Sequence, residues 1–243
     1  MRPPPVLEVA AGVWQVVLPW TRAYILTDGA DFALVDTGTC RDQELLLAAI
    51  QQLGLEPRRC TGIFLTHGHC DHAGNACYFA EQGAKVYAHV AESPFVEAGQ
   101  TYAPSGLRLL GPQGFMFSIG ELYWPVRQLP LGAQLSDNDT IDTPAGTWRV
   151  VHTPGHTPGH IAYFRESDRT LISGDALLNI LPFIRKPGLS LAQPVFTSDL
   201  AQARQSAHKL AALSPRILLP GHGSPLSNDT TARIAAFVAR LHM

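Results

Sequence analysis

The sequence predicts an α/β fold, and three observations lead to that prediction. Short runs of β-branched and aromatic residues alternate along the 243-residue chain with stretches whose apolar residues recur at helical spacing. The alternation continues to the end without a linker-like segment, so we expect one domain over residues 1–243. The longest apolar runs, such as Ile217–Leu219, fall far short of the roughly 20 residues that a membrane-spanning helix needs.

Composition narrows the class of protein further. Lys and Arg number 18 and Asp and Glu number 20, which gives a formal net charge of −2 and offers no basic face for nucleic acid. The cysteines are irregularly spaced and form no C-x-x-C pair, which fits reduced thiols better than a disulfide framework. Glu8 and Gly12 interrupt the apolar residues near the N-terminus, unlike a secretory signal. We therefore expect a cytoplasmic protein with no nucleic-acid or membrane partner.

Four short β-type runs open the chain, separated by glycine, proline and an Asp-Gly turn signal. They cover residues 6–10, 13–18, 23–27 and 32–35. Because only short turn segments separate them, we expect an antiparallel meander. A helix is expected next, with Asp42 as its N-cap and Gly54 as the residue that ends its apolar periodicity.

Strands and helices alternate through the rest of the chain. An apolar strand over residues 62–66 runs straight into a histidine-rich segment, and a helix is expected from Asp71. Further strands are expected near residues 85–88, 147–152, 161–164, 170–173 and 216–219. Further helices are expected from Val90, over 199–213 and over about 228–241.

An apolar insert at about residues 99–131 differs from its surroundings. It has three charged side chains among 33 residues and five of the chain's twenty aromatic residues, with glycine and proline throughout. A second apolar stretch covers residues 177–183. Each stretch is a candidate wall for an apolar substrate, and the alternatives are ordinary core or a contact between two copies of the chain.

Five of the ten histidines and two aspartates form a spaced set. Four of its members lie within six residues at a strand end, and the others follow later strands, two of them in Gly/Pro turns. The set is His67, His69, Asp71, His72, His156, Asp175 and His222. Imidazole and carboxylate suit zinc, iron or manganese. A solvated loop capped by Asp71 is the alternative, but the recurrence of similar settings favours a metal site.

These motifs resemble those of the metallo-β-lactamase-fold hydrolases, whose signature is H-x-H-x-D-H followed by a distant His, Asp and His. The match spans Asp36 to His222. The resemblance implies a four-layer αββα sandwich with a dinuclear site at one edge, holding two zinc ions, with iron or manganese as alternatives. It implies one metal on His67, His69 and His156, the other on Asp71, His72 and His222, and Asp175 bridging both.

Neighbouring residues are assigned from the same resemblance. Asp36 is expected to orient the histidine loop rather than to bind metal. His152 and His160 flank His156 at four-residue spacing, and one of them is a candidate supporting residue. Cys70 occupies a position that the family leaves variable, so we expect it to fill space.

The expected activity is hydrolysis of a small-molecule substrate. Two cations lower the pKa of a shared water, so that a metal-bound hydroxide attacks a carbonyl, and Asp71 is the candidate catalytic carboxylate. No G-x-S-x-G elbow offers a serine nucleophile. We expect an apolar ester-type bond, with a lactone favoured over a thioester, although Leu178 stands where related lactonases often carry tyrosine. No substrate-binding residue is assigned.

Three alternatives remain open at this point. Asp175 argues against a dedicated β-lactamase, because that branch usually has cysteine or serine there. Only 21 residues follow His222, too few for the helical region of glyoxalase II-like thioesterases. The non-enzyme alternative is a metal-binding sensor or redox partner, against which the acidic Asp71 argues.

Overall fold

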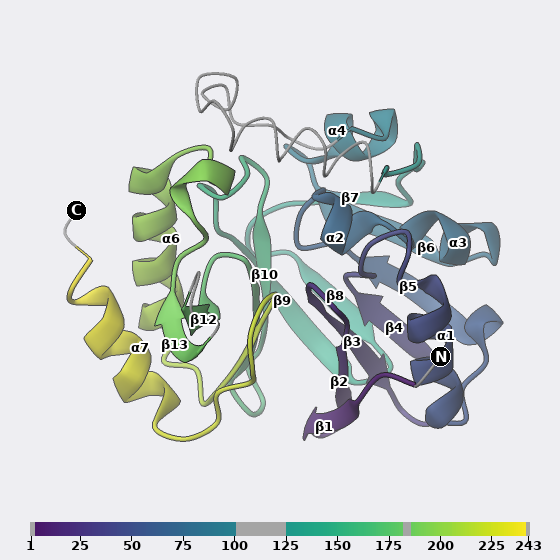
Figure 1. Ribbon diagram of the computed structural model, residues 1–243, viewed down its shortest axis with the longest axis horizontal. Coiled ribbons are helices and arrows are strands. Elements are labelled where there is room, and N and C mark those ends of the chain that lie inside the picture. The colour runs from purple at the N-terminus through teal and green to yellow at the C-terminus, as the bar shows by residue number, and fades with distance from the viewer. Residues whose placement is uncertain (1–2, 101–124, 182–185, 242–243) are drawn as a thin grey trace.

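Two β-sheets face each other in the computed structural model, which describes residues 3–100, 125–181 and 186–241, and helices cover their outer faces (Figure 1). The larger sheet has the strand order β1-β2-β3-β4-β5-β6-β7, and the smaller one has the order β14-β11-β10-β9-β8. Strands β12 and β13 form a separate antiparallel pair.

The strands have the following bounds. The larger sheet contains β1 (Val6–Ala10), β2 (Val13–Val17), β3 (Arg22–Thr27), β4 (Phe32–Val35), β5 (Cys60–Phe64), β6 (Lys85–His89) and β7 (Ala133–Leu135). The smaller sheet contains β8 (Thr140–Thr143), β9 (Gly146–His152), β10 (Ile161–Arg165), β11 (Thr170–Gly174) and β14 (Ile217–Pro220). The separate pair is β12 (Leu178–Leu181) and β13 (Lys186–Ser190).

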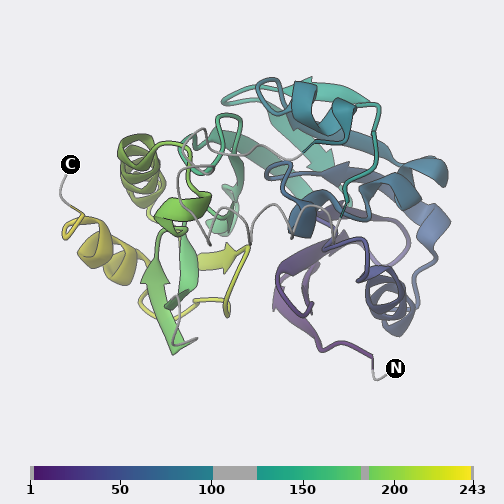
Figure 2. The ribbon, with the colours of Figure 1, turned by 45° about the horizontal axis from the view of Figure 1, so that its top comes forward.

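The helices fall into two groups along the chain. The described helices are α1 (Gln43–Gln52), α2 (Cys70–Ala73), α3 (Ala76–Glu81), α4 (Ser93–Ala98), α6 (Leu200–Ala212) and α7 (Thr230–Val238). Figure 1 shows α6 and α7 on one side of the sheets and α1, α2 and α3 on the other, and Figure 2 shows the same order after a turn of the molecule. No helix in the described ranges is both long and apolar enough to cross a membrane.

Alternation along the strands sorts the apolar side chains into three core layers. Ile25 pairs with Leu34, and both face α1, whereas the next pair, Leu26 and Ala33, faces the smaller sheet. The inter-sheet layer includes the fully buried Trp148. A third layer packs the outer face of the smaller sheet against α6 and α7. Because successive side chains of a strand point to opposite faces, both sheets carry apolar side chains on two faces, which gives the expected αββα sandwich. The predicted fold class is confirmed.

The structure confirms the antiparallel meander of β1 to β4 and shifts several other elements. The strand expected over 62–66 is β5, which begins two residues earlier, after the short 3-10 helix η1 (Pro57–Arg59). The single helix expected from Asp71 is two helices, because the chain breaks at Gly74 and Asn75. Pattern reading missed four strands: β7, β8, β12 and β13.

The helix break has a visible cause. A Cβ at Gly74 would lie 2.4 Å from the Cys40 nitrogen and 2.6 Å from the Gly38 oxygen, so glycine is needed for this close approach. Asn75 then turns inward, and its side-chain amide donates to the carbonyl oxygens of Thr37 and Thr39. These bonds fasten the histidine-bearing segment to the loop that follows β4.

Only the ends of the apolar insert lie within the described residues, because residues 101–124 are outside them. Val126 and Leu129 pack in the layer beneath α1 and α3, so this part of the insert is core. Leu177 is also core, since it packs against α6 and α7, and residues 182 and 183 of the second apolar stretch lie outside the described residues.

Candidate metal centre

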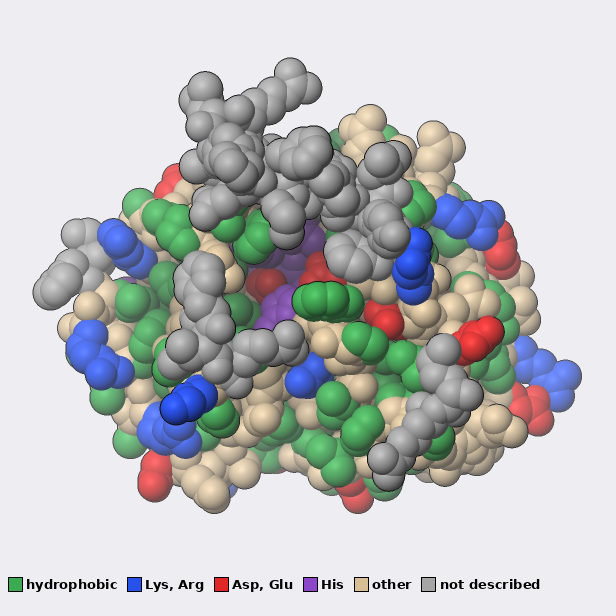
Figure 3. Space-filling view, in the orientation of Figure 1, with side chains coloured by type: hydrophobic (Ala, Val, Ile, Leu, Met, Phe, Trp, Pro, Cys, Tyr) green, Lys and Arg blue, Asp and Glu red, His purple; other side chains and the backbone are tan. Residues whose placement is uncertain are grey.

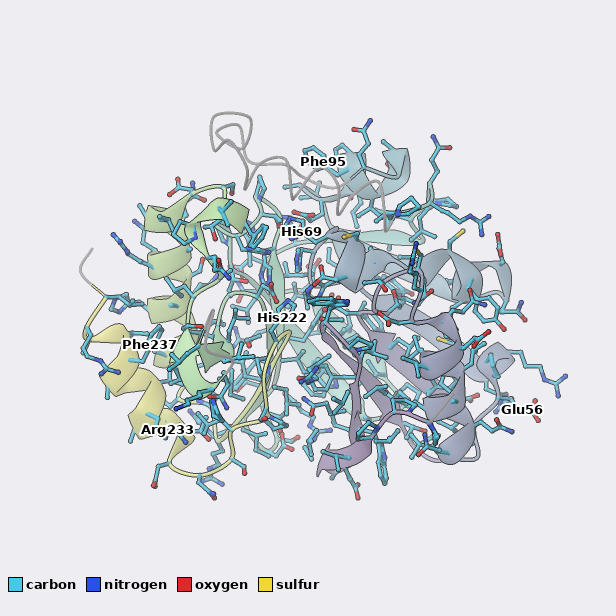
Figure 4. All side chains as sticks on the ribbon, in the orientation of Figure 1. Glu56, His69, Phe95, His222, Arg233 and Phe237 are labelled. Atoms are coloured by element: carbon cyan, nitrogen blue, oxygen red, sulfur yellow. The ribbon has the colours of Figure 1, made fainter. Side chains whose placement is uncertain are left out.

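The seven candidate ligands, far apart in sequence, come together at one edge of the sandwich. Each segment that supplies them follows the end of β5, β9, β11 or β14, and β5 belongs to one sheet whereas the others belong to the second. Figure 3 shows histidine and acidic side chains together near the centre of one face, and Figure 4 shows His69 and His222 between the two halves. The donor atoms form overlapping groups, each within 4.8 Å: His67, His69 and His156; His67, His72 and Asp175; Asp71, His72 and His222.

Three imidazoles form the first group. The Nδ1 atom of His69 lies 3.0 Å from His67 Nε2 and 3.0 Å from His156 Nε2, and all three side chains are buried. The Thr66 hydroxyl donates to Asp36, so it accepts from His67 Nδ1 and leaves a lone pair on His67 Nε2. A single proton on His69 Nδ1 can satisfy one neighbouring nitrogen but not both. The arrangement is poor for hydrogen bonding and suits a cation.

Burial keeps these imidazoles neutral. It lowers the pKa of His67 and of His156 well below the usual histidine value, and neighbouring histidines add to the effect. Burial also lowers the pKa of His69, against the opposing charges of Asp71 and Glu92. Neutral imidazole is the form of histidine that binds metal, so this group fits a divalent cation.

The second group is more polar and more exposed. His72 donates from Nδ1 to the Asp36 carboxylate at 2.8 Å, and its buried Nε2 atom has no hydrogen-bond partner among the described residues. His222 donates from Nδ1 to the Trp20 carbonyl oxygen at 2.7 Å. Both contacts leave Nε2 as the ligand atom, and those atoms lie 3.7 Å and 3.4 Å from Asp71 Oδ2.

Asp175 lies between the two groups. Its Oδ2 atom is 3.6 Å from His156 Nε2 and 3.2 Å from His222 Nε2, and its Oδ1 atom is 3.5 Å from His72 Nε2. Burial opposes its charge, but His222 and His72 hold the pKa of this carboxyl well below its ordinary range. This carboxylate therefore faces both donor groups.

The two flanking histidines have other contacts. His160 pairs its Nδ1 with the Thr153 hydroxyl and accepts the backbone N–H of Asp175 on Nε2, so it fixes Asp175 rather than joining a donor group. His152 donates from Nε2 to the Pro158 carbonyl oxygen and stacks on His89. Neither belongs to a group of metal-type donors among the described residues, and neither does Cys70.

Sequence reasoning missed two residues that build this site. Trp20 holds His222 through its backbone carbonyl, a contact that leaves no side-chain signal in the sequence. Glu92 accepts backbone N–H groups from two of the ligand-bearing loops. Its acidic side chain at the start of an expected helix is ordinary in a sequence, so only its burial reveals it.

Comparisons with known proteins agree with the fold. The model of the Metallo-beta-lactamase superfamily matches residues 21–222. A protein named probable metallo-hydrolase YflN, from Bacillus subtilis, is 31% identical over 232 residues, which cover 90% of this chain and 87% of that protein. The crystal structure of a metallo-beta-lactamase family protein from Thermus thermophilus matches with a TM-score of 0.68 and 28% identity, over 96% of this chain and 80% of that one.

A fungal relative is also similar over most of this chain. It is named atrochrysone carboxyl ACP thioesterase, from Aspergillus fumigatus, and is 26% identical over 93% of this chain and 58% of that protein. The family match covers well over half of the chain, and the His and Asp groups fit a divalent metal. The chain therefore belongs to the metallo-beta-lactamase superfamily of metal-dependent hydrolases.

Proposed function

We propose that the chain hydrolyses a small apolar ester-type substrate at a pair of zinc ions, and that a lactone is favoured over a thioester. The observation that carries the proposal is the pair of donor groups that share Asp175. When bound there, two divalent cations would supply a nucleophile from water at neutral pH and polarise the substrate carbonyl. His67, His69 and His156 would hold one ion, and Asp71, His72 and His222 the other.

Asp71 is the residue best placed to move a proton. Its side chain is 25% exposed, compared with 7% for Asp175 and 2% for Asp36, so it is the candidate carboxylate that opens to substrate. Its Oδ2 atom faces His72 and His222. A carboxylate in this position can hold the attacking water and then pass its proton to the leaving group.

Aromatic side chains near the site support an apolar substrate. The Trp20 side chain is 56% exposed while its carbonyl binds His222. Phe196, at 36% exposed, ends the 3-10 helix η3 (Pro194–Phe196), two residues before Ser198, whose N–H donates to the His156 carbonyl oxygen. Apolar walls around a few polar groups are typical of small-molecule sites.

A thioester is the second candidate substrate. The relative named as an acyl-carrier-protein thioesterase is 26% identical over 93% of this chain, and a thioester presents the same carbonyl for attack. The leaving group is then a thiolate instead of an alkoxide, and the residues that would hold the ions are unchanged.

The first test of the function compares the zinc-loaded protein with its Asp71→Asn variant. We expect the wild type to release acid from a medium-chain acyl homoserine lactone in a weakly buffered indicator assay. The variant is expected to lose about 100-fold or more of that activity while keeping its fold, because proton transfer by a positioned side chain contributes about 10²–10⁴-fold.

The same preparations are then offered a medium-chain acyl thioester and a β-lactam. Turnover of the thioester alone would overturn the lactone preference and support the second candidate. Full activity in Asp71→Asn would refute the role of Asp71. Folded, zinc-loaded protein that hydrolyses none of the three substrates would count against the proposed function and favour a metal-binding role without turnover.

A further inference from the structure

A buried carboxylate outside the donor groups joins two of the loops that carry them. Glu92 is the N-cap residue of α4, and its side chain is completely buried. Its Oε2 atom accepts the N–H of Gly68 at 2.9 Å, and its Oε1 atom accepts the N–H of Gly159 at 3.0 Å. The first of these loops carries His67 and His69, and the second carries His156. One side chain therefore bridges the two halves of the three-imidazole group.

The contact with Gly159 depends on glycine, and the contact with Gly68 leaves little room for a larger residue. A Cβ at Gly159 would lie 2.5 Å from the Glu92 backbone nitrogen and 2.7 Å from its Cγ, so this loop could not approach with any larger residue. A Cβ at Gly68 would lie 3.1 Å from Glu92 Oε2. The two loops thus lie against Glu92 through bare backbone, which allows short hydrogen bonds to both carboxylate oxygens.

Glu92 is itself held firmly. Its backbone N–H donates to the His89 carbonyl oxygen at 2.8 Å, so it is fixed to the end of β6. The His89 ring stacks on His152 with centroids 4.0 Å apart, and His152 donates to the carbonyl of Pro158, next to Gly159. The end of β6 therefore contacts the His156 loop twice, once through Glu92 and once through the stacked rings.

Energetics give the carboxylate a specific role. A charged acceptor that is removed from water needs strong hydrogen bonds, and bonds to a charged group are worth about twice as much as neutral ones. Here the carboxylate accepts those bonds from two backbone N–H groups, which lie in loops that carry metal-type donors. The Nε2 atom of His156 lies 3.0 Å from His69 Nδ1 only if the two loops keep their relative position.

We infer that Glu92 is a positioning residue, which holds the His67–His69 loop and the His156 loop in register so that their three imidazoles converge on one metal ion. The inference rests on the metal-binding part of the proposed function. It does not depend on which substrate is hydrolysed.

Glu92→Gln tests the inference, with Glu97→Gln as the matched control. The glutamine has the same size, but its amide oxygen can accept only one of the two N–H groups, and its NH₂ group then faces the other donor. Glu97 lies on the same helix and is exposed, so its change removes the same charge without touching the loops. Zinc affinity is measured by chelator competition, and cobalt(II) is substituted to record the absorption spectrum of the bound metal.

We expect Glu92→Gln to bind zinc at the three-imidazole group about 10–100-fold more weakly, the range typical for the loss of a residue that supports metal ligands. Its cobalt spectrum should change, and Glu97→Gln should match the wild type in both measurements. In the metal-free protein, the amide of Gly68 or that of Gly159 should exchange hydrogen faster in Glu92→Gln, since one of the two loses its acceptor.

Wild-type zinc affinity and an unchanged cobalt spectrum in folded Glu92→Gln would overturn the inference, whatever the change in melting temperature. If that variant does not fold, Glu92→Asp is judged by the same criterion, because its shorter side chain keeps the charge but cannot span both loops. Both measurements are made without substrate. Absence of lactone and thioester turnover would therefore refute the proposed function and leave the inference on Glu92 standing.

Discussion

Asp36 shows how a single residue organises the site without belonging to a donor group. It follows β4 in the left-handed backbone region with φ of 58°, which is uncommon for a residue other than glycine. Its carboxylate accepts the Thr66 N–H, the Thr66 hydroxyl and His72 Nδ1, each at 2.8 Å. The expectation that Asp36 orients the histidine loop is confirmed by these contacts. The ligand role of His72, which Asp36 orients, stays a prediction.

The protonation of His72 predicts how metal affinity depends on pH. Burial opposes its charge, but Asp71, Asp36 and Asp175 outweigh burial and raise the pKa of His72 to about 10. The metal-free protein therefore holds a proton that must leave before Nε2 binds a metal. Zinc affinity of the second group should rise at least about tenfold per pH unit between pH 6.5 and 8.5, because Asp175 also raises the pKa of His222 against the effect of burial. Titration calorimetry in buffers of different ionisation enthalpy would count the released proton.

The same shift affects the stability of the metal-free fold. Because the pKa of His72 is raised on folding, its contribution is complete below the unfolded value near 6.5 and is lost as pH rises through about 10. The free energy of unfolding of the metal-free protein should therefore be smaller at pH 9 than at pH 7, and urea titration at the two pH values measures the difference. Zinc affinity that does not vary with pH would contradict a protonated His72.

At the scale of elements, helix α6 is tied to the His156 loop by its N-terminus. The Asp199 side chain caps the helix by accepting the N–H groups of Ala201 and Gln202. The backbone N–H groups of Ser198 and Asp199 donate to the carbonyl oxygens of His156 and Gly155. The sequence predicted this helix closely, because capping and helical periodicity are local properties.

Loss of the Asp199 cap should destabilise the protein measurably. We expect Asp199→Ala to lower the free energy of unfolding by about 1 kcal/mol, because two N–H groups lose their acceptor. Asp199→Asn should stay near the wild type, since asparagine caps helices about as well. Urea unfolding of metal-free protein measures both. Equal losses in the two variants would show that the charge of Asp199 matters rather than its cap.

At the scale of the whole molecule, the candidate centre connects the two sheets. His67, His69, Asp71 and His72 follow β5 of the larger sheet, and His156, Asp175 and His222 follow strands of the smaller one. Beyond the inter-sheet core, Tyr163 also spans this interface through its hydroxyl, which donates to the Leu65 carbonyl oxygen at 2.8 Å. Ions bound at the centre would join the same two sheets.

Metal binding should therefore stabilise the whole fold. We expect close to two zinc ions per chain by elemental analysis, and a lower melting temperature after chelation. Metal at about 100 times its dissociation constant contributes about 2.7 kcal/mol per site. His156→Ala should lose metal and most of the zinc-dependent rise in melting temperature. A folded wild type that takes up no offered zinc would refute the ligand assignment.

The sequence by itself determined the types of the candidate ligands, their order along the chain and most strands and helices, because periodicity, caps and turn residues act over a few neighbouring positions. It did not predict the short strands β7, β8, β12 and β13, whose residues lack a clear apolar alternation. Only the tertiary structure decided that Glu92 reaches Gly68 and Gly159, 24 and 67 residues away, and that Trp20 holds His222, 202 residues away. The Glu92–Gly68 contact forms because β5 and β6 are neighbours in one sheet, whereas the contacts with Gly159 and His222 form when the two sheets pack face to face. No local pattern encodes either arrangement.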